Sequence, residues 1–144
     1  MSNSNRVTVD NLSSEIMKYL QEYKEDISDE VKEVSDKLIK EASKELKTIS
    51  PKAKKTVILK SGKSVYPGSY AKSWSIKNGK KATDIYSKIA YNREHYRLTH
   101  LLEFGHAKRD GSRNPGTKEV PHIRKTEDKY REKFIQELKS KIRR

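Results

Sequence analysis

Histidine and glutamate side chains gather in the last third of the chain, at a spacing that metal sites use. His100, Glu103 and His106 follow one another at three-residue intervals, and His122 could fold back beside them. On a helix, His100 and Glu103 would share a face, and Glu-x-x-His is a spacing found in metal centres. Gly105 interrupts the helical pattern before His106, however, and no Asp-rich segment supplies further ligands. We therefore expect these imidazoles to bond the backbone of a loop or helix cap, with a metal-dependent hydrolase as an alternative.

Other catalytic chemistry has less support in the sequence. There is no Gly-x-Ser-x-Gly elbow and no cysteine, so neither common type of activated nucleophile is present. The segment Ser61-Gly62-Lys63-Ser64 contains Gly-Lys-Ser but lacks the first glycine of a phosphate-binding loop. Acidic residues concentrate near the N-terminus, where Glu and Lys four residues apart stabilise a helix surface. We expect no enzyme activity and no metal or other cofactor.

The net charge of +13 is unevenly distributed along the chain. Residues 1–50 carry 8 Lys and Arg against 11 Asp and Glu, a net of −3, whereas residues 51–144 carry 25 against 9, a net of +16. A basic portion of this size indicates an anionic neighbour, either nucleic acid or an acidic protein face. A Lys-rich surface that faces only water is the alternative.

Lysines and aromatic residues alternate in the middle of the chain, as they do in single-strand nucleic-acid binders. Tyr66, Tyr70 and Trp74 are the aromatic residues of this region. The lysines are Lys52, Lys54, Lys55, Lys60, Lys63, Lys72, Lys77, Lys80 and Lys81. Because the chain has few other large residues for a core, we favour the interpretation that Tyr70 and Trp74 form a buried sheet face under a long helix.

The N-terminal third has the pattern of one long amphipathic helix. Its apolar residues recur at steps of three and four: Ile16, Leu20, Tyr23, Ile27, Val31, Val34, Leu38, Ala42, Leu46 and Ile49. Asp10, Asn11 and Ser13 are candidate caps, and Pro51 closes the segment. A helix of this length would reach about 50 Å, more than the width of a compact domain of this size. It therefore either breaks near Asp26–Asp29 or projects and packs on other subunits.

The middle of the chain predicts short strands. Thr56–Leu59 is rich in β-branched residues, and Tyr70–Lys77 alternates with Tyr70, Trp74 and Ile76 on one face. Asn78-Gly79 predicts a type I′ hairpin turn, because both residues tolerate a positive φ. Thr83–Tyr91 supplies the return strand.

Two further helices follow. Glu94–Phe104 places its leucines on one side, with Gly105 as a C-terminal stop, and residues 106–119 have the composition of a basic loop. Pro121 is predicted in the first turn of the last helix. The apolar stripe of that helix consists of Ile123, Tyr130, Phe134, Leu138 and Ile142.

These elements predict an α+β fold over residues 1–144 as a single domain. Residues 1–50 form an amphipathic helix that is able to project, 51–93 a hairpin region, and 94–144 a helix, a basic loop and a helix. With only 32% hydrophobic residues the core is thin, which favours a protein stabilised by assembly. No apolar stretch approaches the roughly 20 residues that span a bilayer, and the polar start is not a signal peptide. We expect a soluble protein without membrane partners.

The segment Thr99–Arg109, THLLEFGHAKR, followed by Pro121-His122-Ile123, resembles a known family. The order of this block, a glycine-containing loop, the Pro-His-Ile triplet and a terminal amphipathic helix is similar to the small neck and tail-completion proteins of long-tailed bacteriophages, the gene-ten family of the Hong Kong ninety-seven type. Tyr70-Ala71-Lys72-Ser73-Trp74 also resembles the central region of that family. The loop sequence GSRNPGTKEV and the opening of the last helix depart from the family pattern.

The resemblance implies a non-enzymatic virion protein of the head–tail junction, assembling as a ring to complete the tail and join it to the head. Its partners would be further copies, neighbouring neck, connector and tail proteins, and packaged DNA, and it would reside in the host cytoplasm before assembly. The expected contact residues are Lys108, Arg109, Arg113 and Lys118. The expected structural corner consists of His100, Leu101, Leu102, Phe104, Gly105, His106, Pro121 and His122. A free, basic nucleic-acid-binding protein is the alternative function.

Overall fold

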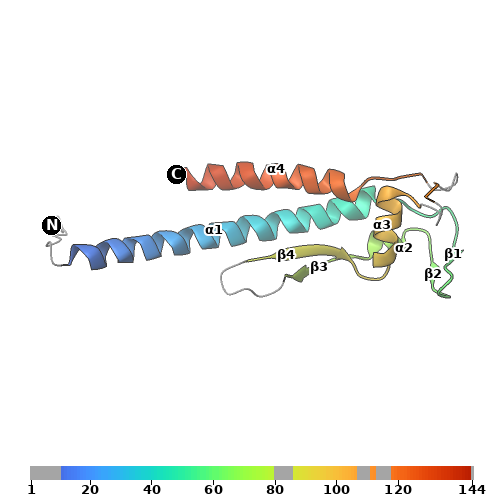
Figure 1. Cartoon of the computed structure of the whole chain (residues 1–144), viewed down its shortest axis with the longest axis horizontal. Helices are drawn as coiled ribbons and strands as arrows, with labels where there is room; N and C mark the ends of the chain where they lie inside the picture. The colour runs from blue at the N-terminus through green and yellow to red at the C-terminus, as the bar shows by residue number, and fades with distance from the viewer. Residues whose placement is uncertain (1–10, 80–85, 107–110, 113–117, 144) are drawn as a thin grey trace.

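The chain forms an α+β structure in which one long helix runs the length of the molecule (Figure 1). In the computed structural model, residues 11–79, 86–106, 111–112 and 118–143 are described. The elements are α1 (Leu12–Ile49), β1 (Val57–Ile58), β2 (Ser64–Val65), α2 (Ser69–Lys72), β3 (Trp74–Asn78), β4 (Lys88–Asn92), α3 (Tyr96–Phe104) and α4 (Ile123–Ile142). Within the described residues, β1 pairs with β2 and β3 with β4, in two separate antiparallel sheets. The predicted α+β fold is confirmed.

Helix α1 is continuous across Asp26–Asp29, so the predicted alternative of a break there is wrong. Its 38 residues correspond to about 57 Å at 1.5 Å per residue. Asn11 occupies the N-cap position, although its side chain makes no cap bond. At the other end Ser50 has ψ 141°, because the following Pro51 excludes the helical conformation. The predicted end of the helix is confirmed.

The core lies under the C-terminal half of α1. Leu46 packs there with Tyr70 of α2 and Trp74 of β3, and the indole N–H of Trp74 donates to Ser50 Oγ at 2.8 Å. Partly buried side chains from the other elements close around this cluster: Ala90, Leu98, Leu102 and Ile123. Tyr70 and Trp74 are thus core residues, as we favoured.

The Asn78-Gly79 turn is not a type I′ turn, and this prediction is wrong. Neither residue has a positive φ. Asn78 instead continues the ladder by pairing with Lys88, and the Gly79 N–H donates to the Ser87 carbonyl at 2.8 Å. Glycine is needed here for close approach, because a Cβ at this position would collide with the Ser87 side chain. The hairpin exists, but its connection begins after Gly79, and residues 80–85 lie outside the described part of the chain.

The strand predicted from Tyr70 begins only at Trp74, because α2 takes up its first residues. Gly68, with φ 80°, turns the chain into α2. The Tyr70 carbonyl then accepts bonds from Ser73 Oγ at 3.0 Å and Asn92 Nδ2 at 2.8 Å. These bonds tie Tyr70 to the start of the sheet without placing it in a strand.

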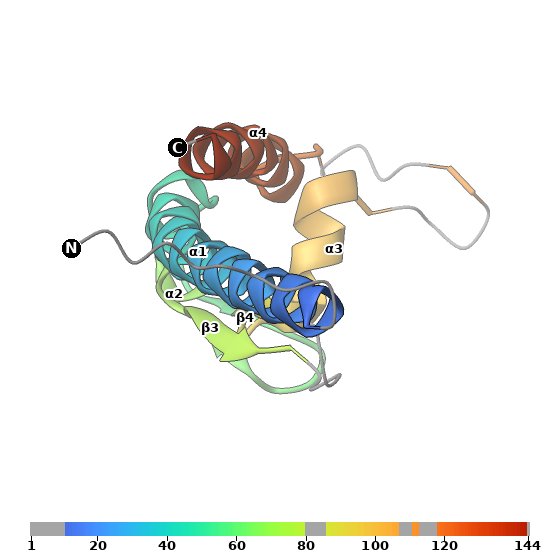
Figure 2. The same cartoon turned by 90° about the vertical axis from the view of Figure 1, so that its left-hand side faces the viewer.

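Helix α4 lies alongside α1 on the side away from the β3–β4 hairpin (Figures 1 and 2). The two helices run antiparallel, since Lys129 near the start of α4 meets Glu45 near the end of α1, and Lys141 meets Glu30. Helix α3 lies near the C-terminal end of α1, where α4 begins (Figure 1). The N-terminal part of α1 therefore extends past the end of α4.

Candidate assembly surfaces

Glu103, at the end of α3, caps the start of α4. Its buried carboxylate accepts the backbone N–H groups of His122, Ile123 and Arg124, each at 2.9 Å. These are among the amides that a helix N-terminus leaves without intrahelical partners. The cap is therefore supplied across the α3–α4 corner, which we define as residues 99–106 and 118–126.

This cap explains why the prediction for Pro121 is wrong. Helix α4 begins at Ile123 with His122 as its N-cap, so Pro121 lies before the helix and is exposed. The start of α4 is set by Glu103, a tertiary partner, and not by the local φ preference of proline.

His122 is the most buried side chain of the corner and is bonded on both ring nitrogens. Nδ1 lies 2.7 Å from the Val120 carbonyl oxygen, and Nε2 lies 2.9 Å from the Tyr70 hydroxyl. A carbonyl only accepts, so Nδ1 carries the proton, and in the neutral ring Nε2 accepts from Tyr70. The imidazole also packs edge-on against Trp74, with ring centroids 6.3 Å apart. This histidine therefore joins the corner to the core.

Burial and hydrogen bonding act in opposite directions on the pKa of Glu103. Burial raises it, but the three backbone N–H bonds and the adjacent His122 together lower it below the ordinary value. For Tyr70, burial and then the nearby Glu103 charge both raise the pKa of the phenol. Glu103 is thus held as a carboxylate that serves a structural purpose.

The other residues of the predicted corner are mostly exposed. His100, Leu101, Phe104 and His106 face solvent, and the rings of His100 and Phe104 contact each other in a tilted arrangement with centroids 5.0 Å apart. In the part of the chain that the structure describes, no three His, Cys, Asp or Glu side chains are arranged to hold a metal ion. Because both carboxylate oxygens of Glu103 accept backbone N–H groups, the structure gives no support to the hypothesis of a metal-dependent hydrolase.

The remaining residues of the predicted corner and of the predicted contact set lie in different surroundings. Leu102 packs against the core, and Gly105, with φ 76°, ends α3 as predicted. Lys108, Arg109 and Arg113 lie outside the described residues. Lys118 is described and exposed.

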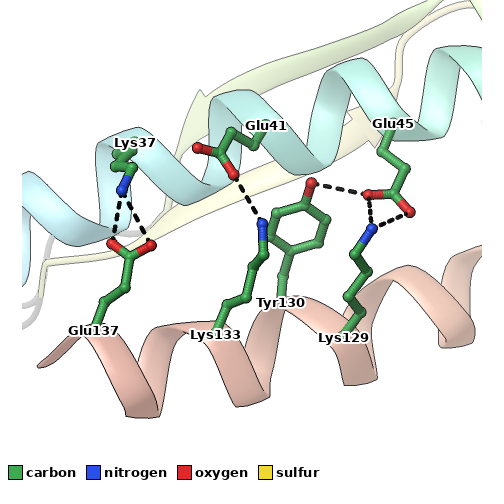
Figure 3. A network of polar contacts seen from close by, with 7 residues as sticks. All are labelled: Lys37, Glu41, Glu45, Lys129, Tyr130, Lys133 and Glu137. Atoms are coloured by element: carbon green, nitrogen blue, oxygen red, sulfur yellow. Dashed lines mark hydrogen bonds and ion pairs between the residues drawn. The ribbon is translucent and has the colours of Figure 1, made fainter. Parts of the chain in front are cut away.

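The seam between α1 and α4 carries a ladder of ion pairs (Figure 3). Lys37 meets Glu137 at 3.0 Å, Lys133 meets Glu41 at 3.3 Å, and Lys129 meets Glu45 at 2.7 Å. Each rung moves four residues along both helices in opposite directions, which keeps every pair on the facing sides. This seam was not predicted from the sequence, although the four-residue spacing of opposite charges in the two helices was a usable signal.

Tyr130 adds an uncharged rung to the same seam. Its hydroxyl donates to Glu45 Oε2 at 2.9 Å. Burial, followed by the Glu45 bond and charge, raises the pKa of Tyr130 to about 12. The bond from Lys129 lowers the pKa of Glu45 against the opposing effect of burial. In the C-terminal half of α1, lysines of α4 thus pair with Glu41 and Glu45, while Asp36 pairs with Lys88 of β4.

The N-terminal half of α1 has no such cover. Lys141, one residue before the end of α4, pairs with Glu30 at 2.7 Å, so residues 12–29 project beyond the ladder (Figure 1). We call this segment the projecting half. Ile27 in this segment is half-buried, but its other large apolar side chains are exposed, and Met17 is the most exposed at 64%. The exposed residues are Leu12, Ile16, Met17, Tyr19, Leu20 and Tyr23. A contiguous apolar patch of this kind marks an interaction site.

The apolar stripe of α1 occupies only one face of the helix. Among the described residues, no helix combines the length and apolar character required to cross a bilayer.

Comparison with known protein families identifies a relationship. The family model described as "Bacteriophage HK97-gp10, putative tail-component" matches residues 14–105, which include all but the first two residues of the projecting half, the core residues Leu46, Tyr70 and Trp74, and α3. No curated protein and no solved structure was found to match the chain. Since the matched segment is well over half of the 144 residues, the chain belongs to the HK97 gp10-like family of bacteriophage tail components.

Proposed function

We propose that the protein is a non-enzymatic structural component of the phage head–tail junction, where a ring of copies completes the tail and joins it to the head. The observation that carries this proposal is the projecting half of α1, an apolar helix face that the described part of the chain leaves exposed. The family match supports a tail component of the virion. On this proposal the protein passes from the host cytoplasm into the neck of the particle.

The arrangement of the chain's polar groups agrees with a structural role. The buried acid Glu103 caps a helix, and His122 is bonded to backbone and to Tyr70. The carboxylates of the α1–α4 seam are matched by lysines. These groups hold elements together, and their bonds leave no open acid–base pair at the corner.

We further propose that the basic loop after α3 contacts the neighbours of the ring. Lys108, Arg109, Arg113 and Lys118 would meet acidic faces of adjacent neck, connector or tail proteins, or the DNA that passes through the lumen. The exposure of Lys118 and the solvent-facing side of α3, with Leu101 and Phe104 exposed, support a contact surface beside the corner. Arginine suits this role because its fork binds carboxylate and phosphate in pairs of bonds.

Joining of separately prepared heads and tails tests this function. Alanine at Lys108, Arg109 and Arg113 should block joining when the variant replaces the wild-type chain. The matched control carries alanine at three exposed cations, Lys125 and Lys139 of α4 and Arg143 at its C-cap. It should join normally. Wild-type joining by the loop variant refutes the loop assignment, and joining in the complete absence of the chain refutes the function.

A nucleic-acid-binding protein is the second candidate. In its favour, Tyr66 is exposed among lysines, although Tyr70 and Trp74 are buried and cannot stack on bases. Such a protein would bind single or double strands with an affinity that falls steeply as salt rises. Steep salt dependence, combined with no association with tail components, would favour this candidate over the junction protein.

A further inference from the structure

We propose that the projecting half of α1 docks on the β1–β2 arm of the next copy of this chain, head to tail. The arm is the segment 52–66, which contains β1, β2 and their turn. This inference rests on the proposed ring and names the two surfaces that would meet in it.

The projecting half is both apolar and acidic. Besides its exposed apolar face, it carries five carboxylates against two lysines, a net charge of −3. Glu15, Glu22 and Asp26 lie on one side of the helix at spacings of seven and four residues, next to the apolar face. Two of its acids have partners within α1: Glu25 accepts from Gln21 at 2.7 Å, and Asp29 pairs with Lys32 at 3.3 Å. A partner for this surface must therefore be apolar and basic.

The β1–β2 arm has the complementary character. Its five lysines face no acidic residue within the segment, which gives a net charge of +5. Lys63 donates to the Glu94 carbonyl at 2.6 Å, whereas Lys52, Lys54, Lys55 and Lys60 have no ion-pair or hydrogen-bond partner in the described structure. Between these lysines Ile58 is 74% exposed and Tyr66 61% exposed. Both strands are two residues long, so the arm is a small, open surface.

The seam between α1 and α4 shows which kind of surface packs on this helix within the molecule. Over its C-terminal half, α1 buries its apolar stripe while lysines of α4 neutralise the carboxylates beside it, as Lys129 does for Glu45. The β1–β2 arm offers the same combination of apolar side chains and lysines. The β1–β2 arm is therefore a suitable partner for the carboxylates of the projecting half, which α4 does not reach.

The two surfaces lie at opposite ends of the molecule (Figure 1). Because α1 is about 57 Å long, the projecting half cannot contact the β1–β2 arm of the same molecule. Contact between unlike ends is heterologous, and such contacts close into rings when the rotation permits. Pairing of two projecting halves is the competing arrangement, and it would bring together two surfaces that each have a net charge of −3.

The free energies of apolar burial and of association are compatible with a ring. Burial of one large apolar side chain contributes about 1.5–3 kcal/mol, so the exposed face of the projecting half offers on the order of 10 kcal/mol. Association costs about 4–15 kcal/mol, so a single contact is weak. Closing a ring makes the last contacts intramolecular, which raises the overall affinity.

Cross-linking tests the contact directly, because the chain has no cysteine of its own. The full chain with Leu20→Cys and Ile58→Cys is treated with a short bis-maleimide, both as purified protein and in joined particles. A ladder of covalent multimers supports the proposal, whereas each single-cysteine variant should give none. Absence of the ladder in both preparations, or dimers from Leu20→Cys alone, overturns it.

Charge reversal supplies the second measurement, in sedimentation of the purified chain at low salt. The helix variant is Glu15→Lys, Glu22→Lys and Asp26→Lys, and the arm variant is Lys54→Glu, Lys55→Glu and Lys60→Glu. Each should weaken self-association at least tenfold, and one chain carrying both sets should recover it. Wild-type association by the arm variant, or no recovery in the combined variant, overturns the docking.

A matched control and the joining assay separate the two proposals. Reversal of two exposed charges on α4, Lys125→Glu and Glu132→Lys, should leave association unchanged. Normal joining by the arm variant overturns the docking and leaves the proposed function standing. Intact docking in a chain that joining does not require overturns the function and leaves the docking standing.

Discussion

The two halves of α1 have the same helical pattern and opposite surroundings. In the C-terminal half, Val34, Leu38, Ala42 and Leu46 are buried at four-residue intervals. In the projecting half, Ile16, Leu20 and Tyr23 continue the stripe and are exposed. The difference arises outside α1, because α4 ends opposite Glu30 and offers nothing further along. An apolar stripe thus specifies that a helix face is to be covered, but not by which chain.

Charge separates the two halves as clearly as burial does. Glu41 and Glu45 of the covered half are matched by Lys133 and Lys129. The acids of the projecting half have no partner from another element among the described residues. The covered half is therefore complete within the monomer, and the projecting half has the properties of one side of an interface.

The largest expected effect comes from truncating the same residue type in each half. Leu38→Ala removes a side chain that is 4% exposed, and it should lower the free energy of unfolding by about 3 kcal/mol. Leu20→Ala removes one that is 57% exposed, and it should change that free energy by less than about 0.5 kcal/mol. Urea unfolding at a concentration where the chain is monomeric measures both. Equal losses would mean that the projecting half is covered in the monomer, and the comparison would fail.

A smaller effect is expected at the corner that positions α4 over the covered half. Glu103→Gln removes the charge from a carboxylate that accepts three backbone N–H bonds, and should cost about 2 kcal/mol. The exposed Glu132→Gln on α4 is the control and should cost almost nothing.

The pH dependence of the same variant gives an independent readout. The folded pKa of Glu103 is lowered, so its contribution to stability is complete above the ordinary value of 4.5 and is lost as the pH falls through the folded pKa. The stability difference between wild type and Glu103→Gln should therefore shrink as the pH falls below 4.5. A difference that stays constant down to low pH would show that the charge is not what holds the cap.

The sequence predicts the elements of this fold better than their connections. The period of the apolar residues places α1, and Pro51 and Gly105 end their helices where predicted, because these signals act on the local backbone. Asn78-Gly79 and Pro121 are equally local signals, but the turn type and the helix start predicted from them are wrong. In both places a partner distant in sequence, Ser87 or Glu103, sets the geometry.

The candidate surfaces show the same division. The exposed stripe of α1 is visible in the sequence, which allows a helix that projects and packs on other subunits. Which half projects could not be predicted, since it depends on the register that Lys129 and Lys141 set between α1 and α4. Glu103 was considered only as a metal ligand. Its role as a cap requires knowing that α3 ends against the start of α4.

The smallest expected effect concerns the ladder itself. Lys133 and Glu41 are 42% and 39% exposed, so a double-mutant cycle with Lys133→Gln and Glu41→Gln should give a coupling of about 0.5 kcal/mol that declines with added salt. Lys18→Gln in the projecting half, where the lysine has no ion-pair or hydrogen-bond partner among the described residues, should leave the stability unchanged. A weak coupling means that the lysines set the register of α4, while apolar burial supplies the stability. The same division would then apply between copies: the arm lysines would choose the partner surface, and the exposed apolar residues would hold it. A salt-insensitive coupling of several kcal/mol would reverse these roles.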